Sequence, residues 1–142
     1  MNQLDNDSNA KVEKKIAAFL AQTSFAVAGA STNREKYGNK VVRVYQQNAK
    51  TVYPINPRAK EIEGALAYPD VASVPEGSLG LSIVTPPKIT VEVVREALKR
   101  GIRHIWMQPG AEHEQAVSEA EKVGATVIHG GPCVLVALGY TE

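Results

Sequence analysis

Phosphate-binding chemistry is indicated first by the stretch FAVAGASTNREKYGNK, residues 25–40. An apolar run ends at Gly29, polar residues follow, and a patterned segment resumes at Gly38. At such a turn, backbone N–H groups and the positive end of a helix dipole attract phosphate. The usual dinucleotide spacing G-x-G-x-x-G is absent, so an ordinary turn remains an alternative. The side chains that could add donors or positive charge are Ser31, Thr32, Asn33, Arg34 and Lys36.

A second apolar run, KTVYPINP, leads to Asn56, Pro57 and Arg58. Domains that bind NAD usually carry a carboxylate at this place, where it accepts from the ribose 2′-hydroxyl. An arginine favours an extra phosphate on the ribose instead, because its guanidinium can bind phosphate through two hydrogen bonds. NADP and coenzyme A (CoA) both carry such a phosphate. The alternative interpretation is a solvated surface arginine.

Two later strand ends offer different chemistry. The segment Thr85-Pro86-Pro87 lacks backbone donors at its prolines, so it suits the hydrocarbon part of a ligand, although a helix start with proline in its first turn is favoured. In the stretch WMQPGAE, Gln108 could hydrogen-bond an amide or a ribose, whereas Trp106 is expected in the core. Gly110 closes this second turn.

The remaining reactive side chains form no catalytic set. His104 begins a predicted strand, His113 lies on a predicted helix, and only His129 follows a strand end. The chain order brings no Ser-His-Asp or Cys-His arrangement together, and spacings typical of metal ligands are absent. The sequence therefore predicts neither a catalytic residue nor a metal site.

The sequence predicts alternating strands and helices that would position these loops. Apolar runs predict strands within residues 24–30, 50–57, 79–87, 103–110 and 125–131. Helical spacing predicts helices over 9–22, capped by Ser8 or Asn9, and over 38–48, 88–100 and 111–124, whereas 61–77 is a turn-rich connection. The alternation predicts a three-layer, Rossmann-type doubly wound α/β sheet of about five parallel strands in a single domain. Ligands of such sheets bind beyond the carboxyl ends of the strands, where the strand order reverses.

Composition limits the classes of partner that the chain is expected to bind. The chain has 142 residues, 44% hydrophobic and 22% charged, with a net charge of +1. Nothing in that charge favours nucleic acid or an anionic membrane. A single cysteine suits a reducing compartment, the N-terminus lacks a signal peptide pattern, and residues 1–8 are polar. We therefore expect a cytoplasmic protein with a flexible segment over 1–8 and one domain over 9–142.

The order of these motifs resembles a known family. The blocks VAGAS, KYGN, VYPINP, EIEGALAY, IVTPPK, WMQPGAE and GPC are together similar to the small stand-alone CoA-binding proteins. These are Rossmann-type domains like the CoA-binding domain of the succinyl-CoA synthetase α subunit. The resemblance extends over about residues 10–137, nearly the whole chain.

The resemblance implies a set of ligand contacts. The diphosphate would contact Gly29, Ala30, Ser31, Asn33 and Arg34; the adenosine 3′-phosphate would lie by Pro57 and Arg58, with Lys60 nearby; the ligand would pass Thr85, Pro86 and Pro87 and meet Met107, Gln108 and Pro109. Cys133 matches a cysteine of the family, but Pro132 stands where the family usually has arginine. The segment that carries the synthetase's phosphorylated histidine has no match, so ligase activity is not implied.

Three functions follow from the sequence. The first is non-catalytic binding of CoA or an acyl-CoA at the carboxyl ends of the parallel strands. The alternatives are an NADP-dependent oxidoreductase, which Arg58 permits, and a regulatory module without a ligand. A homo-oligomer or an unknown protein partner stays open.

Overall fold

The chain alternates helices with short strands. The structure, a computed structural model, describes residues 3–142, with side chains described from residue 9. In chain order the elements are α1 (Gln3–Leu20), β1 (Ser24–Ala28), α2 (Tyr37–Gln47), β2 (Thr51–Ile55), β3 (Glu61–Ile62), β4 (Ala65–Leu66), the 3-10 helix η1 (Val71–Ser73), β5 (Leu79–Ile83), α3 (Pro87–Lys99), β6 (His104–Met107), α4 (Glu114–Lys122), β7 (Thr126–Ile128) and α5 (Val134–Ala137).

Five strands form one parallel sheet in the order β2-β1-β5-β6-β7. The chain moves outward from β1 to β2 and then returns past β1 to β5, so the strand order reverses between β1 and β5. Ala28, at the end of β1, is level with Ile55 of β2 and Ile83 of β5. The first three core strands therefore end side by side at the point of reversal, which is where ligands of doubly wound sheets bind.

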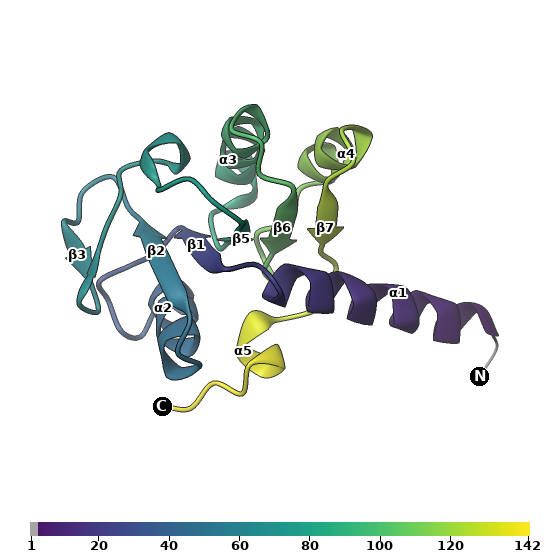
Figure 1. Cartoon of the computed structure of the whole chain (residues 1–142), viewed down its shortest axis with the longest axis horizontal. Helices are drawn as coiled ribbons and strands as arrows, with labels where there is room; N and C mark the ends of the chain where they lie inside the picture. The colour runs from purple at the N-terminus through teal and green to yellow at the C-terminus, as the bar shows by residue number, and fades with distance from the viewer. Residues whose placement is uncertain (1–2) are drawn as a thin grey trace.

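Helices cover both faces of the sheet (Figure 1). The helices α1, α2 and α5 lie on one face, and α3 and α4 lie on the other. The alternation of strand side chains divides the core in the same way: Phe25 and Val27 pack with Trp106 on the α2 face, whereas Ala26 and Ala28 pack on the α3 face. The predicted three-layer α/β sheet of five parallel strands is confirmed.

The start of α1 and the segment 61–77 differ from the sequence-based expectation. The first helix begins at Gln3, so a cap at Ser8 or Asn9 is wrong. The apolar spacing revealed only the part of α1 in which Phe19 is buried and Ile16 and Leu20 pack against the core. Residues 1–2 lie outside the described residues, and flexibility over 1–8 stays a prediction. The turn-rich connection contains the hairpin β3–β4, whose turn places Glu63 at φ 50° and Gly64 at φ 79°.

Candidate functional site

Two adjoining hollows open at the carboxyl ends of β1, β2 and β5. One has a volume of about 340 Å³ and the other about 440 Å³. Both are lined by Gly29, Ala30, Asn56 and Thr85, so they form one crevice, which we call the carboxyl-edge crevice. It lies at the reversal of strand order between β1 and β5.

Close packing of two glycines brings α2 against the end of β1. Gly29 has φ 91°, and a Cβ there would lie 2.9 Å from Val84 Cγ2. A Cβ on Gly38, in the first turn of α2, would lie 2.1 Å from the carbonyl oxygen of Gly29. These positions explain why glycine stands at both ends of the loop. The contact sets the N-terminus of α2 beside the crevice, where its first N–H groups have no partner within the helix.

The loop between these glycines is held by its own polar side chains. Ser31 Oγ accepts from the Asn33 N–H at 3.0 Å, and Asn33 Oδ1 accepts from the Glu35 N–H at 3.0 Å. Lys36, the residue before α2, makes no side-chain cap within the described residues. Ser31 and Lys36 line the crevice, whereas Asn33 does not. The structure therefore gives Asn33 a part in shaping the loop.

A buried network behind the loop fixes its path. Asn39 is fully buried and donates to the Ser31 carbonyl at 2.9 Å and to Glu63 Oε2 at 3.1 Å. Arg43 is 7% exposed, and it donates to Asn39 Oδ1 and to the Arg34 carbonyl at 2.7 Å each. These bonds hold the loop in one shape before a ligand arrives.

Glu63 is a functional candidate that sequence reasoning missed. Its carboxylate forms an ion pair with Arg34, and the hydrogen bond from Asn39, followed by that from Arg34, lowers the pKa of Glu63. Arg34 is thus directed toward the β3–β4 hairpin and is absent from the crevice lining. No local pattern reveals this contact, because the residues are 29 positions apart.

The loop after β2 is tied to the first loop through Asn56. Its Oδ1 accepts from the Arg58 N–H at 2.8 Å and the Ala59 N–H at 3.0 Å, and its Nδ2 donates to the Ala30 carbonyl at 2.9 Å. Pro57 lines the crevice, and Arg58 is exposed beside it. Asn56 therefore positions the backbone from which Arg58 projects.

The loop between β5 and α3 lines the crevice and also contains the start of the helix. Thr85 and Pro86 line the crevice, and Thr85 Oγ1 lies 2.8 Å from Thr90 Oγ1. Pro87 is the first residue of α3 and Pro86 precedes it. The favoured interpretation, proline in the first turn of a helix, is therefore confirmed, and Pro87 stands outside the crevice lining.

At the end of β6, neighbouring residues differ in their burial. Met107 is fully buried in the core on the α3 face, and Pro109 and Gly110 are exposed. Gln108 is fully buried, and its Oε1 accepts from the Val134 N–H at 2.9 Å. The crevice lining includes none of these four residues. Trp106 lies in the core, as expected.

Tyr37, which sequence reasoning did not single out, connects the crevice to Cys133. Tyr37 lines the crevice; its hydroxyl lies 2.5 Å from Cys133 Sγ and donates to Gln108 Oε1 at 3.3 Å. Burial, and then the hydrogen bond with Cys133, raises the pKa of Tyr37. Gln108 Nε2 is buried without a hydrogen-bond partner among the residues that the structure describes. We call these three residues the inner cluster.

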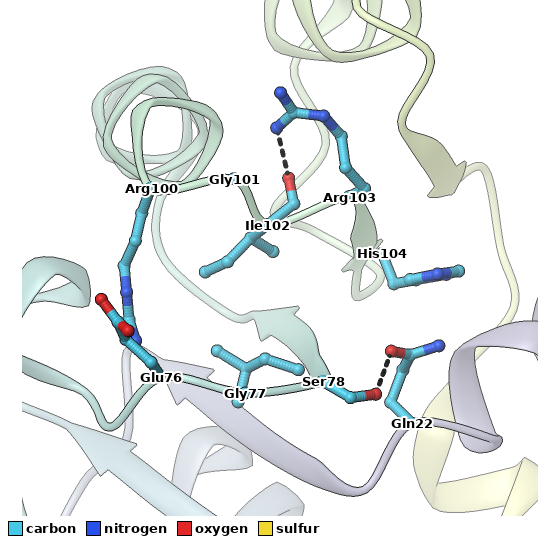
Figure 2. A pocket seen from close by; sticks show the side chains of 10 residues that line it. Gln22, Glu76, Gly77, Ser78, Arg100, Gly101, Ile102, Arg103 and His104 are labelled. Atoms are coloured by element: carbon cyan, nitrogen blue, oxygen red, sulfur yellow. Dashed lines mark hydrogen bonds between the residues drawn. The ribbon is translucent and has the colours of Figure 1, made fainter.

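A further hollow lies at the opposite edge of the sheet (Figure 2). We call it the amino-edge hollow; it has a volume of about 400 Å³ and is lined by Gln22, Glu76, Gly77, Ser78, Leu79, Arg100, Gly101, Ile102, Arg103 and His104. Ser78 Oγ donates to Gln22 Oε1 at 2.6 Å on one side, and Arg103 donates to the Ile102 carbonyl at 3.0 Å on the other. His104 Nδ1 is buried without a partner in the described part of the chain.

The other histidines of the described chain lie apart from the crevice lining. His113 precedes α4 and accepts from the Gln115 N–H at 3.1 Å, so it caps the helix and lies outside it. His129 is exposed after β7. Over residues 3–142, no three His, Cys, Asp or Glu side chains lie together as metal ligands would. Within the same range no helix has the length and apolar character of a membrane span.

Comparisons with known proteins agree on one family of domains. A family model described as a CoA binding domain matches residues 23–139. The ADP-forming acetate–CoA ligase II of Archaeoglobus fulgidus is 33% identical over 70% of this chain, and the α subunit of the ADP-forming acetate–CoA ligase II of Pyrococcus furiosus is 29% identical over 82%. The chain spans only 16% and 28% of the length of these two ligases.

Solved structures share the fold. A conserved hypothetical protein from Pyrococcus furiosus superposes with a TM-score of 0.76 at 36% identity, covering 80% of this chain and 97% of that one. A dinucleotide-forming acetyl-coenzyme A synthetase 1 from Ca. Korarchaeum cryptofilum, solved with phosphate and ADP, superposes with a TM-score of 0.68 at 29% identity. That match covers 75% of this chain and 25% of the synthetase.

Proposed function

The chain belongs to the CoA-binding domain family, and from that premise we propose that it binds coenzyme A or an acyl-CoA in the carboxyl-edge crevice without catalysing a reaction. The observation that carries the proposal is the contact of Gly38 with Gly29. A Cβ at Gly38 would lie 2.1 Å from the Gly29 carbonyl oxygen, so only glycine lets α2 begin this close to the end of β1. The contact supports a phosphate site at the helix N-terminus.

The ligand's diphosphate belongs, in this proposal, at the first turn of α2. The N–H groups of Asn39 and Lys40 donate to the Lys36 carbonyl, which leaves those of Tyr37 and Gly38 at the helix start for an anion. The helix dipole also favours negative charge there. Lys36 lines the same part of the crevice and adds a positive charge. Because the hydrogen bonds of Asn39 and Arg43 already order the loop, ligand binding costs little further loss of conformational freedom there.

The adenosine end lies toward the loop after β2 in this proposal. Pro57 would contact the nucleoside, and the exposed guanidinium of Arg58 would bind the ribose 3′-phosphate. Asn56 supports this role, because its Oδ1 accepts from the Arg58 N–H at 2.8 Å and so fixes the backbone that carries the side chain. An arginine at this place disfavours plain NAD.

In this proposal the chain binds its ligand but does not turn it over. Among the residues lining the crevice, Tyr37 has its pKa raised by burial, so it stays protonated at neutral pH and is a poor base. The relatives' names describe ligases, but the chain spans only 16% and 28% of two of them. Their activity is therefore not transferred to this chain, although a protein partner that works with the bound ligand fits the proposal.

The test is identification of the ligand. Native mass spectrometry of the purified protein should show a CoA-sized ligand, and calorimetric titration should give tighter binding of CoA than of NADP. NADP has no pantetheine arm to lie along Thr85 and Pro86, and its extra phosphate is on the other ribose hydroxyl. Tightest binding of NADP would instead favour an oxidoreductase. Steady hydrolysis of an acyl-CoA, abolished by a substitution at His129 or Cys133, would contradict the non-catalytic role.

A further inference from the structure

The inner cluster combines three polar side chains with little exposure to water. The Tyr37 hydroxyl lies 2.5 Å from Cys133 Sγ and 3.3 Å from Gln108 Oε1. Gln108 is fully buried, and Tyr37 and Cys133 are half-buried. Because Tyr37 also lines the crevice, the cysteine stands one side chain away from the proposed ligand.

Gln108 carries a donor that nothing in the described part of the chain satisfies. Its amide orientation is fixed, because Oε1 accepts from the Val134 N–H at 2.9 Å. A flipped amide would set two donors against each other. Nε2 must therefore be the buried atom that lacks a partner. Buried polar groups are nearly always hydrogen-bonded, and an exception calls for a water or a ligand atom.

The chemistry of the missing partner follows from the neighbours. An amide N–H₂ needs an acceptor oxygen, and a sulfur atom stands close to the same tyrosine hydroxyl. The pantetheine arm of CoA has an amide carbonyl close to its terminal thiol. A ligand whose carbonyl accepted from Gln108 would thus bring its own sulfur toward Cys133.

We propose, resting on the CoA-binding function above, that the inner cluster receives the sulfur end of the ligand and that Cys133 undergoes thiol–disulfide exchange with CoA disulfide. The Cys133 thiolate attacks one sulfur of CoA disulfide, the S–S bond of that ligand breaks, and a Cys133–CoA disulfide forms. The second CoA leaves as a thiolate and takes up the proton that Cys133 lost. CoA disulfide is the only oxidant, and it is reduced to one CoA for each cysteine oxidised.

The other two residues act as positioning residues in this step. When the Cys133 sulfur carries charge, the Tyr37 O–H turns from Gln108 Oε1 and donates a hydrogen bond to that sulfur, since a thiolate is an acceptor. Gln108 Nε2 holds the carbonyl oxygen of the arm. Binding of the nucleotide end of CoA disulfide holds its sulfur atoms near Cys133. This proximity makes its exchange faster than that of a disulfide that the crevice does not bind.

The test is the rate of adduct formation, followed by intact mass spectrometry. Wild-type protein should gain the mass of one CoA from CoA disulfide, about tenfold or more faster than it gains glutathione from an equal concentration of glutathione disulfide. In denaturant the two rates should become equal. Arg58→Ala should slow the reaction with CoA disulfide and leave that with glutathione disulfide unchanged. Cys133→Ser should give no adduct.

Binding of reduced CoA to Cys133→Ser, measured by calorimetry, separates the two proposals. If that variant binds CoA but the wild type forms no adduct, or reacts equally fast with both disulfides, this inference is overturned and the proposed function stands. If neither protein binds CoA, the proposed function itself fails.

Discussion

The two edges of the sheet carry hollows whose individual volumes are similar but whose character is opposite. The carboxyl-edge crevice comprises volumes of about 340 and 440 Å³, and the amino-edge hollow has about 400 Å³. At the carboxyl edge α2 begins, and its first N–H groups lack helical partners. At the amino edge α3 ends, and its carbonyl groups attract cations from the chain itself.

The arginines of the amino edge already donate to backbone carbonyls of the chain, of which one, that of Leu98, belongs to the last turn of α3. Arg103 donates to the carbonyls of Leu98 at 3.2 Å and Ile102 at 3.0 Å, and Arg100 donates to the Val71 carbonyl at 2.8 Å. The volume of a hollow therefore does not make it a ligand site. In the proposed function the direction of the chain distinguishes the two edges, because the helices that connect parallel strands begin at one edge of the sheet and end at the other.

The largest effect is expected for Gly38→Ala. The new Cβ would lie 2.1 Å from the Gly29 carbonyl oxygen, so α2 must move away from β1. We expect denaturant unfolding to show a loss of about 1–3 kcal/mol in stability. Calorimetry should detect no CoA binding. The control is Gly101→Ala at the amino edge, where φ is 87° but a Cβ meets no atom within 4 Å. That variant should lose stability and keep its CoA affinity; loss of affinity in both would break the contrast between the edges.

Arg58→Ala comes next. A guanidinium bound to a ribose phosphate contributes about 1.5–3 kcal/mol, which is about ten- to a hundredfold in affinity. We therefore expect CoA affinity to fall by that factor in calorimetry and the affinity for dephospho-CoA to stay nearly constant. If the wild type bound CoA and dephospho-CoA equally, Arg58 would be only a surface residue.

Glu63→Gln should have a smaller effect in the opposite direction. The amide can keep a bond to Asn39, but it removes negative charge near the phosphate loop and releases the Arg34 guanidinium. A partly exposed ion pair is worth about 0.2–1 kcal/mol, so CoA affinity should rise up to about fivefold. Glu76→Gln at the amino edge is the matched control and should change nothing. A fall in affinity for Glu63→Gln would mean that the ion pair shapes the loop more than it competes for the ligand.

The smallest effect on binding is expected for Arg103→Ala. The guanidinium donates to the Leu98 carbonyl in the last turn of α3 and to the Ile102 carbonyl in the loop that follows, so its loss should lower the free energy of unfolding by about 0.5–1.5 kcal/mol. Calorimetric CoA affinity should match the wild type. A clear drop in affinity with intact folding would assign the amino edge to the ligand.

The sequence predicted the frame because that frame depends on local patterns. Continuous apolar runs such as FAVA gave the buried strands, and Pro86 with Pro87 marked the start of α3. Gly29 and Gly38 flagged the loop, although their mutual contact is visible only in three dimensions. The turn-rich interpretation of residues 61–77 overlooked the hairpin because two-residue strands leave no periodic signal.

The contacts that cross the fold were beyond sequence reasoning. Glu63 reaches Arg34 from another element, and Tyr37 meets Cys133 across 96 positions of the chain. Met107 shows a different limit: side chains alternate along a strand, so a residue at a strand end can point into the core, as this one does.

The location of the CoA site is tested most directly by titrating CoA into isotope-labelled protein and following the backbone amide signals by NMR. We expect the largest shifts from Gly29 to Gly38, at Asn56 and Arg58, and at Thr85. Signals of Gln22, Ser78 and Gly101 at the amino edge should stay in place. Shifts concentrated at the amino edge, or no saturable shift at all, would contradict the claim that the carboxyl-edge crevice is the CoA site.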